Sequence, residues 1–128
     1  MSRHIPKPPE QSDNEARSVL TKALIRAADF WEFKNNQMAK ILGVDESTIS
    51  RMKAHGRLIN PLTKEGELAL LFVRAFRSLD AVMGGHIENE KAWLHGYNHV
   101  LKGIPATLLQ TVTGLNAVVV YLDAIRGH

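Results

Sequence analysis

The sequence contains no cysteine among its 128 residues. This absence excludes a disulfide framework, thiolate metal sites and catalytic thiols, and it agrees with a reducing compartment. No hydrophobic run approaches the ~20 apolar residues that span a bilayer. The start of the chain, Met1–Pro9, also lacks the apolar centre of a signal peptide. We therefore expect a cytoplasmic protein that makes no use of a membrane.

Residue patterns typical of catalysis are absent as well. The sequence has no glycine-rich phosphate loop and no serine-histidine-acid arrangement. His95 and His99 have the spacing of a helical metal pair, but no third ligand is evident and no acidic catalytic residue lies between them. Trp31 and Trp93 are interpreted as core or interface anchors. We predict that the protein is not an enzyme and that it needs neither a metal nor a cofactor.

The composition is that of an ordinary globular protein, with 45% hydrophobic and 23% charged residues. The length fits one compact domain, or two helical halves that share a core. The net charge is only +3, but the segment 34–64 contains just two acids, Asp45 and Glu46. Its cations are Lys34, Lys40, Arg51, Lys53, Arg57 and Lys64. This local excess of positive charge indicates a phosphate-bearing partner.

Helical periodicity and capping signals divide the first part of the chain. Residues 1–12 are proline-rich and lack apolar periodicity, so we expect a flexible arm. Ser12 and Glu15 form a capping-box pattern that predicts a helix over 13–32. Short helices are then expected over 36–42, ending at Gly43, and from residue 45 or 46 onward. Asn60 and Pro61 predict the cap and first turn of a long buried helix, which ends at Gly84 and Gly85.

The second part of the chain is also predicted to be helical. One helix is expected over 88–101, with Trp93, Tyr97 and Val100 on one stripe, and a short one from Pro105 to Leu109. After a break over 111–114, the segment 115–126 contains a β-branched run, which by propensity alone could form a strand. A helical apolar period across that segment and Gly127 at its end favour a helix. The predicted fold is all-α, with halves 13–84 and 85–128.

The segment 36–52 has the pattern of a helix-turn-helix. Ala39 is small enough for two steeply crossing helices to touch, and Gly43 permits the tight turn between them. On the third helix, Ser47 and Arg51 are predicted to read base edges, and Glu46 is a candidate acceptor for cytosine. Gln37, Lys53 and the pair Asn35/Asn36 are expected to anchor phosphates. The predicted DNA-binding residues are Asn36, Gln37, Glu46, Ser47, Thr48, Ser50, Arg51 and Lys53.

Two alternatives to DNA binding stay open at this point. Any pair of short helices joined by glycine can imitate the pattern without contacting DNA. The acids Asp45 and Glu46, if they face the groove, favour an interaction module that no longer binds DNA.

The last helix carries two apolar stripes. One consists of Leu115, Val118, Val119, Leu122 and Ile125, and the other of Ala117, Val120, Tyr121 and Ala124. A terminal helix buries one stripe in its own core, so the second needs a partner or another copy of the chain to cover it. The alternative is that this helix is central and wrapped by the others.

The C-terminal half resembles the toxin-binding domain of Xre/MbcA/ParS-type antitoxins. The shared pattern is a tryptophan helix, Asn-x-x-Leu-x-Gly-x-x-Pro, Leu-Leu-x-Thr-x-x-Gly and a closing amphipathic helix that ends in glycine. Its matching residues are Asn98, Leu101, Gly103, Pro105, Leu108, Leu109, Thr111, Gly114, Val118, Leu122 and Gly127. The chain departs from the pattern at Gly96 and Tyr97, because a proline commonly precedes the asparagine in relatives. The helix-turn-helix is similar to the one such antitoxins carry.

The resemblance implies an Xre-like helix-turn-helix bundle continuous with a small toxin-binding domain. It implies a type II antitoxin that neutralises a RES-domain, NAD-degrading toxin and represses its own operon, acting as a homodimer or a larger assembly with the toxin. In that family the C-terminal helix and tail block the entrance to the toxin's active site. The corresponding residues here are Tyr121, Ala124, Ile125, Arg126, Gly127 and His128. The alternative is a transcriptional regulator whose C-terminal half serves only for dimerisation.

Overall fold

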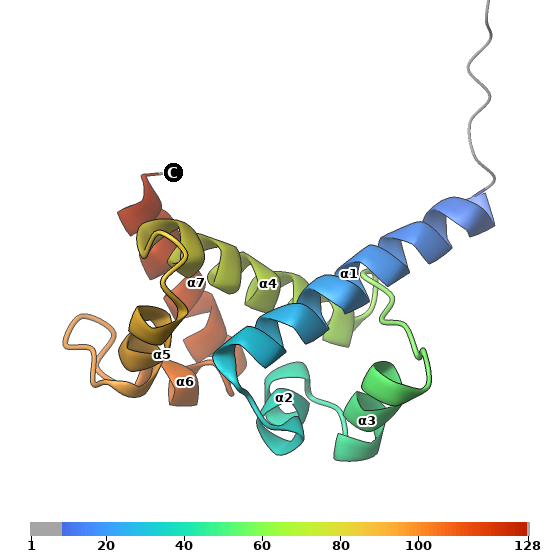
Figure 1. Ribbon diagram of the computed structural model, residues 1–128, viewed down its shortest axis with the longest axis horizontal. Helices are drawn as coiled ribbons and strands as arrows, with labels where there is room; N and C mark the ends of the chain where they lie inside the picture. The colour runs from blue at the N-terminus through green and yellow to red at the C-terminus, as the bar shows by residue number, and fades with distance from the viewer. Residues whose placement is uncertain (1–8, 128) are drawn as a thin grey trace, which may run out of the picture.

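The computed structural model describes the backbone of residues 9–127 and the side chains of residues 13–127 (Figure 1). Over these residues the chain forms helices and no strand, which confirms the predicted all-α fold. The helices are α1 (Pro9–Trp31), α2 (Asn35–Leu42), α3 (Glu46–Ala54), α4 (Lys64–Val82), α5 (Ile87–His95), α6 (Pro105–Leu108) and α7 (Val112–Arg126).

The long helix α4 is the centre of the fold. It passes behind α1 in Figure 1 and packs against both α1 and α7. Its residues Phe72, Ala75 and Leu79 are completely buried, because an apolar stripe along a central helix is covered from more than one side. The buried apolar side chains from α1 to α7 form one continuous cluster. The two predicted halves therefore share a single hydrophobic core.

Helices α2 and α3 form the predicted helix-turn-helix unit. Gly43 ends α2 in the left-handed conformation, with φ of 68°, which a residue without a side chain adopts without strain. Asp45 is the N-cap of α3, and its carboxylate accepts a hydrogen bond from the backbone of Thr48. Ala39 is buried at the contact between the helices. Local capping and one small residue thus set the sharp turn between α2 and α3.

Three predicted helix starts are wrong, and at α4 and α7 the reason is that Thr63 and Thr111 supply the caps. Helix α1 begins at Pro9 and runs through Ser12, since proline fits the first turn of a helix. Residues 9–12 are therefore helical, and the rest of the predicted arm lies outside the described residues. Helix α4 is capped by Thr63, whereas Asn60 forms the turn before it by accepting from the backbone N–H of Leu62. Helix α7 begins at Val112, not after a break.

The predicted helix over 88–101 is also too long. Helix α5 ends at His95, and Tyr97 and Val100 are exposed instead of lying on its stripe. The side-chain oxygen of Asn98 accepts hydrogen bonds from the backbone N–H groups of Val100 (3.0 Å) and Leu101 (2.8 Å). An asparagine that captures these donors competes with the helical pattern and favours a turn. The turn is closed by paired backbone hydrogen bonds between Asn98 and Gly103.

A buried acid joins α5 to the core. Glu90 is fully buried, and its Oε1 accepts a hydrogen bond of 3.1 Å from the indole nitrogen of Trp31. Its Oε2 is buried without a donor among the described residues. The pKa of Glu90 is raised to about 7, first by burial and then by a hydrogen bond with Asp80 and the negative charge of Asp80, while the bond from Trp31 opposes the rise. A proton on Glu90 allows it to donate to Asp80.

This arrangement predicts a pH-dependent contribution to stability. A carboxyl group with a raised pKa in the folded state binds more protons there than in the unfolded chain, so stability falls as pH rises from about 4.5 to about 7. The Glu90→Gln variant keeps an acceptor for Trp31 and supplies an uncharged donor to Asp80. We expect it to be more stable than the natural chain above pH 7, by at most about 3 kcal/mol.

Urea unfolding of both chains between pH 4 and pH 8 measures this effect. The difference in unfolding free energy is expected to grow as pH rises through the window and to be small or reversed at its acid end. Parallel stability curves for the two chains would show that Glu90 does not change its protonation in this range.

Candidate functional site

The outer surface of α3 presents most of the predicted DNA-binding groups. Glu46, Ser47, Ser50, Arg51 and Lys53 are all exposed. Since the apolar residues of α3, Ile49 and Met52, are buried against the core, the polar side chains lie on the opposite face. The helix therefore offers short hydrogen-bonding groups and two cations to a ligand, which are side-chain types that read a DNA groove.

Thr48 differs from the other predicted contacts because only 7% of it is exposed. Its hydroxyl donates to Asp45 Oδ1 over 2.6 Å and accepts from Arg51 Nη2 over 3.2 Å. Ser47 also donates to Asp45. These bonds, those from Thr48 first, hold the pKa of Asp45 at about 2. Thr48 thus supports the N-cap at Asp45 and positions Arg51, and the carboxylate of Asp45 is engaged with α3 itself.

A second network ties the start of α2 to α3. The side chain of Asn35 donates to Ser50 Oγ over 3.3 Å and accepts from Lys53 Nζ over 2.6 Å. Gln37 accepts from the backbone N–H of Lys34 over 2.8 Å, and the side-chain oxygen of Asn36 accepts from the backbone N–H of Gln37. Asn36 is exposed and Gln37 half-buried. The predicted phosphate-anchoring residues therefore gather around the N-terminus of α2, where a helix favours anions.

Helix α7 presents one apolar face to the core and another to solvent. Leu115, Val118, Val119 and Leu122 are buried. The side chain of Val120 is 59% exposed and that of Ile125 48%, so the assignment of Ile125 to the inner stripe was wrong. We call the solvent-facing set the outer face of α7. It consists of Ala117, Val120, Ala124 and Ile125, with the half-buried Tyr121 stacked on Trp93 at its edge.

The C-terminal end of α7 lies against α4. Arg126 Nη1 donates to Ser78 Oγ over 3.4 Å, and Gly127 ends the helix in the left-handed conformation with φ of 91°. His128, the last of the predicted toxin-binding residues, lies outside the described residues. Of that predicted set, Tyr121, Ala124 and Ile125 gather at the outer face of α7, whereas Arg126 lies against α4. Sequence reasoning missed the cations of α4 near Arg126, which carry no periodic signal.

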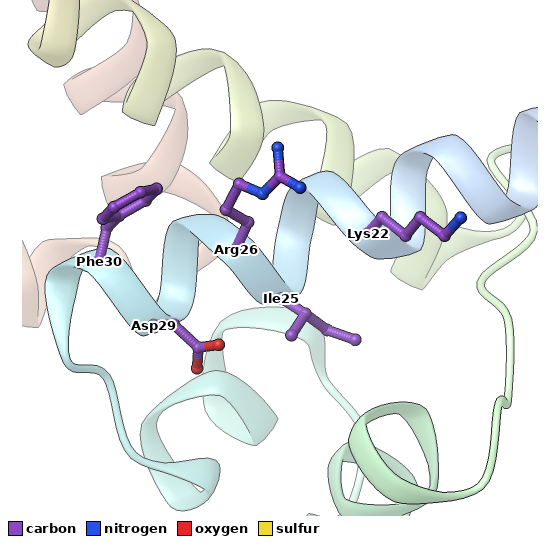
Figure 2. A pocket seen from close by; sticks show the side chains of 5 residues that line it. All are labelled: Lys22, Ile25, Arg26, Asp29 and Phe30. Carbon is purple, nitrogen blue, oxygen red and sulfur yellow. The ribbon is translucent and has the colours of Figure 1, made fainter.

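A groove of about 430 Å³ lies along α1, lined by Lys22, Ile25, Arg26, Asp29 and Phe30 (Figure 2). All of these side chains come from one helix. Figure 2 shows Arg26 and Phe30 on the side of α1 toward α4, and Asp29 on the opposite side. No group of titratable side chains converges there, so the groove is not a candidate catalytic site.

Two further kinds of site, a membrane span and a metal site, are absent from the described part of the chain. None of its helices is long and apolar enough to cross a membrane. Over the same residues, no group of three or more histidine, aspartate or glutamate side chains is placed to hold a metal ion.

Comparison with protein families identifies both halves of the chain. Residues 10–74 match the model of the antitoxin Xre-like helix-turn-helix domain. Residues 78–127 match the model of the antitoxin Xre/MbcA/ParS C-terminal toxin-binding domain. No curated protein matches the chain. The two matches together cover α1 to α7, with the helix-turn-helix domain first and the toxin-binding domain second. The chain therefore belongs to the Xre/MbcA/ParS antitoxin family.

Proposed function

We propose that this antitoxin neutralises a RES-domain, NAD-degrading toxin by direct binding, and that the outer face of α7 and the C-terminal residues block the toxin's active site. The observation that supports the binding surface is the exposed apolar face within the segment that matches the toxin-binding domain. An amphipathic helix with a second, uncovered apolar stripe is the kind of element that docks into a partner's groove. The RES identity of the toxin rests on the family resemblance.

Co-expression with the product of the neighbouring gene tests this proposal. The full chain is expected to restore growth, to co-purify with the toxin and to preserve the cellular NAD pool. A chain ending at Ile125 keeps the buried Leu122 and tests whether the last residues are needed for blocking. If the full chain neither binds nor protects, a transcriptional regulator whose C-terminal half only dimerises becomes the better interpretation. A toxin that is neutralised but leaves NAD intact would exclude the RES assignment alone.

We also propose that the protein represses its own operon by placing α3 in the major groove of operator DNA. Arg51 supports this interpretation because the hydroxyl of Thr48 holds its guanidinium in place, and a positioned arginine can contact guanine through two hydrogen bonds. The proposed contacts of α3 include Glu46, Ser47, Ser50 and Lys53, and those of α2 include Asn36 and Gln37. Thr48 acts through Arg51. Since repressors of this type read paired half-sites, the proposed DNA-binding form is a dimer.

The Arg51→Ala variant is expected to bind operator DNA about 10- to 100-fold more weakly, because one bidentate base contact contributes about 1–3 kcal/mol of discrimination. An electrophoretic shift with the promoter of its own operon measures the effect, at one fixed salt concentration. Arg26→Ala, an equal loss of charge at the exposed groove of α1, is the control and should bind as the natural chain does. Failure of the natural chain to bind the promoter would favour an interaction module without DNA-binding activity.

A further inference from the structure

Three arginines from two distant segments of the chain line one groove between α4 and α7. Its volume is about 430 Å³, and it is lined by Leu70, Val73, Arg74, Arg77 and Arg126. Arg74 and Arg77 lie one turn apart on α4, and the packing of α7 against α4 brings Arg126 beside them. We call this site the arginine groove. Two of its three cations lie outside the residues 78–127 that match the toxin-binding domain.

The arginine groove carries more positive than negative charge. Asp123 pairs with Arg74 through a contact of 2.7 Å and accepts a hydrogen bond of 3.2 Å from Ser78. Arg126 donates only to the hydroxyl of Ser78 in the described structure. Arg77 has no acidic partner within the described residues. Among the described residues, one carboxylate therefore faces three guanidinium groups, which leaves a net positive charge available to a ligand.

This excess charge does not serve the stability of the isolated chain. Cations three residues apart on a helix repel one another by a few tenths of a kcal/mol. The groups are also exposed, so solvent weakens whatever they contribute to folding. An anionic occupant would remove the repulsion, and guanidinium groups bind carboxylates through paired hydrogen bonds.

The position of the arginine groove favours the toxin as its occupant. Arg126 belongs to α7, the helix whose outer face is the proposed toxin contact, so the groove lies on the same helix, on the side that packs against α4. In Figure 1 the C-terminal end of α7 lies at the top of the molecule, whereas α2 and α3 lie at the bottom. A duplex held by α3 therefore lies away from the groove.

We propose that the arginine groove binds carboxylate side chains on the surface of the toxin, so that the toxin contact has an apolar part on α7 and a basic part on α4. This inference rests on the proposed antitoxin function. It adds Arg74 and Arg77 to the interface as specificity-determining residues. Charged contacts at the edge of an apolar interface favour the correct partner and speed its association.

The test compares Arg77→Glu with Arg26→Glu, which makes the same charge change at an exposed arginine on α1. Binding of each full chain to the purified product of the neighbouring toxin gene is measured at two salt concentrations, with operator DNA as a second ligand. Arg77→Glu is expected to weaken toxin binding about tenfold or more and to reduce its salt dependence, and Arg26→Glu to change it less than about twofold. Arg77→Ala should show a smaller loss in the same direction. Equal melting temperatures would show that all variants are folded.

The possible results separate this inference from the antitoxin proposal. If the natural chain binds the toxin and the two glutamate variants bind it equally well, the arginine groove is not part of the interface. If Arg77→Glu loses binding to DNA but not to the toxin, the groove contacts phosphates and the inference is overturned. If the natural chain does not bind the toxin at all, the antitoxin proposal fails and this inference fails with it.

Discussion

The Val120→Glu variant should lose toxin binding by about 100-fold or more, because a charge in the middle of the proposed apolar contact would have to be buried without a partner. Val120 is 59% exposed on α7 of the free protein. Glutamate also has a higher helix propensity than valine, so the substitution should not disturb the helix. The loss should therefore appear in binding and in the rescue of growth, and not in folding.

Val19→Glu is the matched control for this experiment. Val19 is 64% exposed on α1, and the substitution makes the same change in size and charge. Calorimetry with the purified toxin gives the affinities, and circular dichroism gives the melting temperatures. If Val120→Glu binds the toxin as tightly as Val19→Glu does, the outer face of α7 is not the toxin contact. Point variants are also sharper than a deletion that extends to Leu122, because such a deletion removes a buried core residue.

The Gly114→Ala variant should destabilise the protein by about 3 kcal/mol, since the added methyl group has no space. Its Cβ would lie 2.1 Å from the backbone oxygen of Leu108 and 2.7 Å from the hydroxyl of Thr111. That hydroxyl accepts a hydrogen bond from the backbone N–H of Gly114 and so caps α7. The backbone at the junction between α6 and α7 must move to admit the methyl group. We expect the hydrogen bond that caps α7 to weaken and α7 to shift against α4.

Thermal unfolding checks this prediction, with an expected fall in melting temperature of about 10 °C or more. Thr113→Ala changes the neighbouring exposed position in the same turn and should alter the melting temperature only slightly. A Gly114→Ala chain that melts with the control would mean that the junction relaxes at little cost. Toxin affinity measured well below the melting temperature would then show whether α7 has shifted.

Much of the fold could be predicted from local pattern. Gly43 and Gly127 were expected to end helices, and both do so with positive φ. The β-branched run in the last helix was correctly predicted to be helical, because the apolar period of the whole segment outweighs the propensity of three residues. The errors fell at helix boundaries, where the side chain of Thr63 caps α4 in place of Asn60 and the side chain of Asn98 accepts from backbone N–H groups of the expected helix. Which competitor captures a donor depends on three-dimensional geometry that a sequence pattern does not contain.

The candidate sites also contain features that local pattern predicts and features that it does not. The polar face of α3 and the second apolar stripe of α7 follow from helical periodicity, and the resemblance to the antitoxin family follows from motif spacing. By contrast, the burial of Thr48 beneath Arg51 could not be read from spacing, because Thr48 precedes Arg51 by one helical turn and was expected to share its exposed face.

The sequence by itself determined the helices, the helix-turn-helix and the antitoxin family, since each depends on residues within a few turns of one another. Only the tertiary structure decided which polar groups meet across the chain. The arginine groove brings Arg74 and Arg77 to Arg126, and the core brings Glu90 to Trp31. The physical reason is that both contacts are created by packing α4 and α5 against helices far away in sequence, and a local period has no information about such neighbours.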